Sequence, residues 1–160
     1  MTALRARRLV AGYDGTAVVR GIEALVNMSQ MTVSEMDIHH TSPSRQQRQH
    51  WLGEQALAWS GLPVVTVRPT IFLDSFLTLA GTSVRERSRI ELPFGRGRTN
   101  PVAASDVAQA VAEILAEPAP HLGRVYELTG PRSQDLHGMA REFTEALGRE
   151  ITYVDIAPEA

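Results

Sequence analysis

A run of β-branched residues with a proline at each end constrains this chain more than any other feature. Residues 64–67 read Val-Val-Thr-Val and lie between Pro63 and Pro69. β-branched side chains favour strands, and proline ends a strand abruptly because it cannot donate to the ladder. A short, continuously apolar strand is typical of a parallel sheet covered on both faces. We therefore expect a buried strand over residues 62–69.

Strand and helix patterns alternate along the rest of the chain. Further strands are expected over 24–28, 90–93, 125–129 and 151–155, and a short helical or irregular stretch over 70–76. Three helices are expected, over 45–60, from 105 or 106 to Pro118, and from 133 to Gly148, with Ser44, Ser105 or Asp106, and Ser133 as their N-caps. The first helix should face inward with Trp51, Leu52, Gln55, Ala56 and Trp59. This alternation predicts an α/β fold: a partial doubly wound, mainly parallel Rossmann-like sheet with flanking helices.

Composition excludes several classes of protein. The 160 residues contain no cysteine, which fits a reducing, cytoplasmic environment and leaves no thiolate chemistry. A net charge of −2 with interspersed signs predicts no nucleic-acid partner, and no apolar run approaches the roughly 20 residues of a membrane span. The five histidines, at 39, 40, 50, 121 and 137, form no metal-binding spacing, so no metal site is expected.

Four segments taken together resemble one known family. They are Val26–Ser29, the run from Glu54 through Pro63 into 67–72, Asn100–Val102 leading into 105–108, and Tyr126–Pro131. In this order and spacing the chain resembles the NmrA-like atypical short-chain dehydrogenases/reductases from about Gly21 to Pro158. The resemblance implies a doubly wound sheet whose ligand lies outside the carboxyl ends of the strands.

The resemblance also implies roles for particular residues. Pro69, Thr70, Ile71 and Phe72 match the family segment that passes beside the nicotinamide ring of NAD(P). Ser29 matches a strand-end position where the wider superfamily often keeps a catalytic serine, which also places it near the cofactor. Two plainer interpretations stand beside these: Phe72 belongs to the core, and the Ser29 hydroxyl caps the next turn.

Two parts of the family pattern differ or are missing. The Tyr-x-x-x-Lys pair that relatives use for proton transfer falls here on Gln46 and His50, and no tyrosine lies between Tyr13 and Tyr126. Glutamine has no exchangeable proton of suitable acidity, whereas His50 can shuttle one near neutral pH or merely contact ligand or solvent. No G-x-G-x-x-G turn occurs, and the apolar run with Gly12 and Gly15 is a poor substitute because Asp14 repels an anion.

These differences set the expected organisation and function. Residues 1–15 are expected to form an atypical N-terminal segment, and 16–160 the C-terminal part of an NmrA-like NAD(P)-binding domain. The first strands of the parent sheet would be absent, which exposes a sheet edge and predicts a homodimer or a covering partner chain. The leading hypothesis is a truncated NAD(P)-dependent oxidoreductase for a quinone-like or small carbonyl substrate, with His50 and Ser29 as catalytic residues. The alternatives are a non-catalytic NAD(P)-sensing regulator and an inactive remnant that needs a partner chain.

Overall fold

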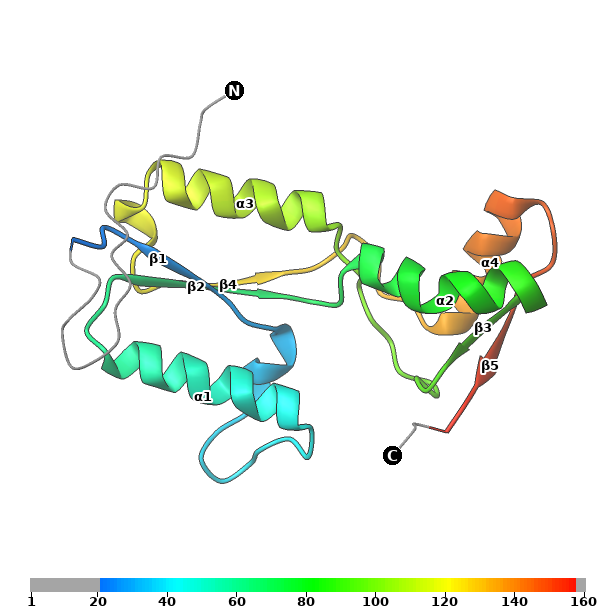
Figure 1. The fold of residues 1–160 in the computed structure, drawn as a ribbon, viewed down its shortest axis with the longest axis horizontal. Coiled ribbons are helices and arrows are strands. Elements are labelled where there is room, and N and C mark those ends of the chain that lie inside the picture. The colour runs from blue at the N-terminus through cyan, green and yellow to red at the C-terminus, as the bar shows by residue number, and fades with distance from the viewer. Residues whose placement is uncertain (1–20, 158–160) are drawn as a thin grey trace.

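The computed structural model describes residues 21–157, which form two groups of elements joined by three crossings of the chain (Figure 1). The predicted segments at 1–15, including Gly12, Asp14 and Gly15, lie outside the described residues. In chain order the elements are β1 Leu25–Met28, the short 3-10 helix η1 Met31–Glu35, α1 Arg45–Trp59, β2 Val64–Pro69, α2 Leu73–Arg87, β3 Arg89–Leu92, α3 Ala104–Ala116, η2 Ala119–His121, β4 Val125–Leu128, α4 Leu136–Leu147 and β5 Thr152–Asp155.

The first group is a three-stranded parallel sheet in the order β1-β2-β4, with α1 and α3 on opposite faces (Figure 1). Val26 pairs with Val65 and Met28 with Val67. Val65 and Val67 are fully buried against Val107 of α3, in a cluster that also contains Val102 and Ile114. The expected buried strand over residues 62–69 is confirmed, and so is the α/β architecture.

The second group contains α2, α4 and a separate two-stranded parallel sheet of β3 and β5 (Figure 1). Its core surrounds Phe76, Ile90 and Leu136, which are all fully buried. The expectation of a single sheet is therefore wrong: β3 and β5 are strands, as predicted, but they pair with each other. The stretch expected to be short or irregular after Thr70 is a helix of 15 residues, α2.

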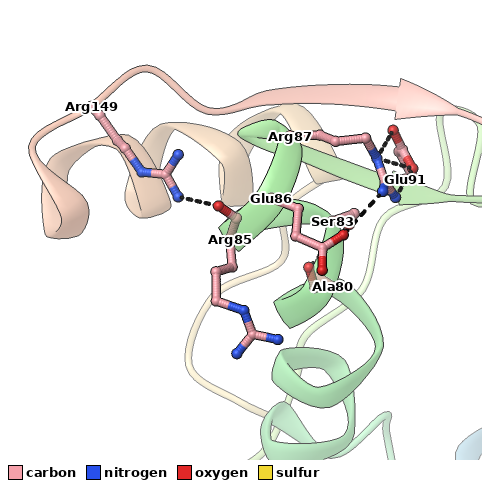
Figure 2. Close-up of polar contacts among 7 residues, drawn as sticks. All are labelled: Ala80, Ser83, Arg85, Glu86, Arg87, Glu91 and Arg149. Carbon is pink, nitrogen blue, oxygen red and sulfur yellow. Dashed lines mark hydrogen bonds and ion pairs between the residues drawn. The ribbon is translucent and has the colours of Figure 1, made fainter.

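Two arginines fix the end of α2: Arg149 joins it to the chain that enters β5, and Arg87 joins it to β3 (Figure 2). The Arg149 guanidinium donates to the carbonyls of Val84, at 2.7 Å, and Arg85, at 3.5 Å. The Val84 carbonyl also accepts from the Ser88 nitrogen at 3.1 Å, whereas the Arg85 carbonyl is one of those that the last turn of a helix leaves without an intrahelical partner. Arg87 lies beside the carboxylate of Glu91, with a shortest N–O distance of 2.7 Å. These contacts fix the second group at the side away from the three-stranded sheet.

The helix caps differ from those expected. Ser44 occupies the N-cap position of α1 but makes no cap hydrogen bond. Asp74, from the first turn of α2, accepts a hydrogen bond of 3.1 Å from the backbone of Ala104, so neither Ser105 nor Asp106 caps α3. Asp135 caps α4 through the Gly138 nitrogen at 2.8 Å, in place of Ser133. Gly148 ends α4 at φ 63°, as predicted.

The inner face of α1 is rotated from the predicted one. Leu52 and Trp59, expected inside, are 58% and 82% exposed, while Glu54 is only 8% exposed. The reason is electrostatic: the Glu54 carboxylate forms an ion pair with Arg68 of β2. A rotation by one residue, about 100° around a helix, brings Glu54 inward and carries Leu52 and Trp59 outward.

Candidate nicotinamide-side site

Three strand ends meet at one edge of the three-stranded sheet. The Ser29 nitrogen donates to the Val67 carbonyl at 2.8 Å, which extends the β1-β2 ladder by one step. The Thr70 nitrogen donates to the Leu128 carbonyl at 2.9 Å, which does the same for β2 and β4. Because all three strands are parallel, this is the carboxyl edge, where open α/β sheets bind their ligands.

The segment 69–72 leaves this edge and connects the two groups of elements. Ile71 packs against the core of the second group and Phe72 against the core of the first. Both are held by Val102, whose nitrogen donates to the Ile71 carbonyl at 3.1 Å and whose carbonyl accepts from the Leu73 nitrogen at 2.9 Å. Phe72 thus packs against the core while staying partly exposed, and its role toward a cofactor stays a prediction.

A single carbonyl connects the three crossings. The Asn100 carbonyl accepts from the Thr70 hydroxyl at 2.5 Å and from the Gly130 nitrogen at 3.0 Å. Gly130 is buried so tightly that a Cβ there would lie 1.9 Å from the Pro101 carbonyl oxygen. Only glycine allows this approach between Gly130 and Pro101, and the Thr70 hydrogen bond ties the segment 69–72 to the same Asn100 carbonyl.

Ser29 is buried at this edge without a hydrogen-bond partner. Its side chain is 4% exposed, and its hydroxyl has no partner among residues 21–157. The plainer interpretation, in which the hydroxyl caps the next turn, is not supported, because η1 has no side-chain cap bond. Native structures pair most buried polar groups, and a buried hydroxyl at a ligand-binding edge is therefore a candidate ligand contact.

A second unpaired group was not predicted from the sequence. The amide nitrogen of Gln30 is buried and has no hydrogen-bond partner in the described part of the chain. Gln30 has an extended backbone, with φ −148° and ψ 153°. No sequence signal marks this residue, since glutamine after a strand is ordinary loop chemistry.

Ser29 faces α1. Met28 pairs with Val67, so the next residues, Ser29 and Arg68, lie opposite each other and face the same side of the sheet. Arg68 contacts Glu54 of α1, so this side is the one that α1 covers. His50 lies one helical turn before Glu54 and is half-buried. The helix that follows a parallel strand runs back along the sheet, so His50 is nearer the carboxyl edge than Glu54. The structure therefore places Ser29 and His50 on the same face of the sheet, near the same edge.

A bidentate ion pair fixes this face. The Arg68 Nε lies 3.0 Å from Glu54 Oε1, and Arg68 Nη2 lies 2.6 Å from Glu54 Oε2. Glu127 of β4 adds a longer contact of 3.6 Å to Arg68. The hydrogen bond with Glu54 is the main cause that raises the pKa of Arg68 above its ordinary value. The guanidinium is therefore a permanent charge that holds α1 over β2.

No tyrosine replaces the missing proton donor within residues 21–157. The Tyr126 hydroxyl lies 2.7 Å from His121 Nδ1. The Tyr153 hydroxyl lies 2.8 Å from a carboxylate oxygen of Asp155 and 3.0 Å from the Leu92 carbonyl in the second group of elements, so its one proton is shared between these two acceptors. Gln46 is exposed on α1. His50, one helical turn after Gln46 on α1, therefore stays the candidate for proton transfer.

Other parts of residues 21–157 offer weaker candidates for a site. No group of three or more His, Asp or Glu side chains could hold a metal ion within 21–157. None of the described helices is long and apolar enough to cross a membrane. A surface pocket of about 270 Å³ lies at the start of α4, but its Arg132 and Gln134 side chains already contact Glu142, at 2.8 and 3.1 Å.

Comparison with known proteins finds relatives among reductases. No family model matches the chain. It is 32% identical over 111 residues to the NAD(P)H azoreductase of Xenophilus azovorans, and the matched region covers 68% of this chain and 38% of that protein. It is 30% identical over 117 residues to quinone oxidoreductase 2 of Escherichia coli, which covers 73% of this chain and 40% of that protein.

Solved structures agree with these relatives. The NADPH-dependent quinone oxidoreductase of Escherichia coli superposes with a TM-score of 0.73 at 27% identity, over 84% of this chain and 46% of that one. A triphenylmethane reductase of Citrobacter, at 19% identity and a TM-score of 0.71, shares the fold. The chain has the fold of an atypical short-chain dehydrogenase/reductase. This confirms the expected resemblance. The chain spans only part of its relatives, 38% of the length of the azoreductase and 40% of the length of quinone oxidoreductase 2.

Proposed function

We propose that this chain forms the nicotinamide side of an NAD(P)-dependent oxidoreductase site, at the carboxyl ends of β1, β2 and β4. The observation that carries the proposal is the buried, unpaired hydroxyl of Ser29 at this edge, beside the segment 69–72. An unpaired polar group in such a place fits a ligand that brings its own hydrogen-bond partner. Pro69, Thr70 and Phe72 would line the other side of the nicotinamide.

Reduction of a substrate needs a hydride and a proton, and different groups would supply them. When bound, the reduced cofactor supplies the hydride. Ser29 would donate its hydroxyl proton in a hydrogen bond to the substrate oxygen, and the imidazolium form of His50 would release the proton that completes a hydroxyl group, leaving neutral imidazole. The names of the relatives favour a quinone-like or other small conjugated or carbonyl substrate.

Calorimetric titration of NADPH and of NADH into the purified chain tests the premise. Binding of either in the micromolar range is expected, weakened in Ser29→Ala. Turnover of a quinone is expected to fall at least tenfold in His50→Ala, because general acid catalysis contributes about 10²–10⁴-fold. Gln46→Ala is the matched control, since Gln46 lies one turn away on α1 and is exposed. A folded wild type that binds neither dinucleotide would refute the proposal.

A second candidate function is an NAD(P)-sensing regulator without turnover. It is favoured by the exposed glutamine at the tyrosine position, Gln46, and by the engagement of the Tyr126 and Tyr153 hydroxyls elsewhere. Stoichiometric binding without quinone reduction would select this function. A dependence on a partner chain is the third candidate, since β1 pairs only with β2 among the described strands; binding that appears only in a dimer or a complex would select it.

A further inference from the structure

The amide of Gln30 is a buried donor for which the described residues provide no acceptor. Its nitrogen is inaccessible and unpaired, although the backbone around it is well bonded: the Gln30 carbonyl accepts from the Val33 nitrogen at 3.1 Å. An unpaired buried donor costs about 1–3 kcal/mol. The residue that carries this cost adjoins the carboxyl edge of the three-stranded sheet.

Gln30 and Ser29 face opposite sides of the sheet. Ser29 lies on the α1 side, so the extended backbone directs Gln30 toward the α3 side. The β1 and β2 residues on that side include Val26, Val65 and Val67, which pack with the apolar core and offer no side-chain acceptor. Continuing the strand register places Gln30 beside Pro69, the first residue of the segment proposed to pass the nicotinamide.

We propose that Gln30 is a ligand-positioning residue, whose amide donates a hydrogen bond to a carbonyl or carboxamide oxygen bound across the carboxyl ends of β1 and β2. This inference rests on the proposed function. Ser29 and Gln30 then hold the ligand from the two faces of the same strand. The oxygen belongs either to the nicotinamide carboxamide or to the substrate carbonyl, and the experiment separates the two.

The test compares Gln30→Met with wild type and with Gln46→Met as the control. Methionine has a similar length but cannot donate, so it removes the unpaired group from the apo protein. The melting temperature of apo Gln30→Met is expected to equal or exceed that of wild type. Ligand affinity is expected to fall about 5- to 10-fold, the loss of one hydrogen bond. A purely structural glutamine would behave differently, because its replacement would lower the melting temperature.

Two titrations, with NADPH and with ADP-ribose, and the KM for the quinone identify the acceptor. If it is the carboxamide, NADPH affinity falls in Gln30→Met while the affinity for ADP-ribose, which lacks nicotinamide, does not change. If it is the substrate carbonyl, NADPH affinity is unchanged and the KM for the quinone rises 5- to 10-fold. Either result supports the inference.

Equal NADPH affinity and equal KM in Gln30→Met and wild type would overturn this inference and leave the proposed function standing. A melting temperature several degrees below wild type would also overturn it. Failure of wild type to bind either dinucleotide would overturn the proposed function and this inference together, so the two failures are distinguishable.

Discussion

Replacing Glu54 by Gln should destabilise the chain by about 3 kcal/mol. The substitution keeps the shape of the side chain but leaves the Arg68 guanidinium, 18% exposed, without its main counter-ion. Breaking a buried ion pair from one side costs about 3–5 kcal/mol. The lower end applies because Arg68 keeps a weaker contact with Glu127, which is 46% exposed and 3.6 Å away.

Urea unfolding followed by circular dichroism measures this cost. For a chain of this size, 3 kcal/mol corresponds to a melting temperature about 6–12 °C lower. Joint replacement of Glu54 by Leu and Arg68 by Met should recover most of the loss, since it leaves no unpaired charge. Glu91→Gln is the matched control: the shortest N–O distance in the Arg87–Glu91 pair is 2.7 Å, against 2.6 Å for Arg68 and Glu54, but Arg87 is 49% exposed. A much smaller effect is therefore expected.

A loss below about 1 kcal/mol for Glu54→Gln, with an unchanged dependence on urea, would refute the reasoning. It would mean that solvent already screens Arg68, and that the ion pair does not determine which face of α1 turns inward. The rotated face of α1, and with it the placement of His50, would then need another explanation.

Three further predictions concern other parts of the chain. Gly130→Ala should lower the free energy of unfolding, measured with urea, by about 3 kcal/mol or more, because the new Cβ meets the Pro101 carbonyl. Gly53→Ala, which has open space around it inside a helix, should raise that free energy by about 0.5–1 kcal/mol. Equal effects of the two substitutions would contradict the close approach at Gly130. Hydrogen bonds from the Gly95 backbone and from Tyr153 lower the pKa of Asp155 below 3.8. The stabilisation that Asp155 provides is therefore present above that pH and is lost as pH falls through the lower pKa of the folded state. In Asp155→Asn the free energy of unfolding should fall less steeply with decreasing pH, and identical acid melts of variant and wild type would count against this. Trp59→Ser should reduce self-association in sedimentation without changing the unfolding midpoint, because Trp59 is 82% exposed; an unchanged sedimentation profile would exclude this surface as the contact.

The strands were predictable because their signals are local. A β-branched run between Pro63 and Pro69 needs no tertiary information to be recognised as a buried strand. The ends of α3 and α4 at proline and glycine are also local. The family resemblance then predicted the carboxyl edge and Ser29, which the structure shows to be buried there.

The errors involve contacts between distant residues. Helical periodicity placed Trp59 inside, and only the ion pair with Arg68, 14 residues beyond Glu54, explains why it lies outside. The cap of α3 comes from Asp74, 30 residues before Ala104. Pairing of β3 with β5 joins segments about 60 residues apart, and no single segment encodes it. Gln30 is recognisable only once the burial of its amide is known.

The three crossings of the chain have a consequence for folding. The sheet of β1, β2 and β4 is completed only by residues that follow α2 and β3, and the second sheet only by residues that follow β4. Neither group is therefore a continuous stretch of polypeptide that can be cut out and studied alone. Because the Asn100 carbonyl joins partners 30 residues away in both directions, the slow step should be closure of these long loops. Both groups should then appear in one cooperative transition, with the carboxyl edge of the three-stranded sheet among the last parts to form.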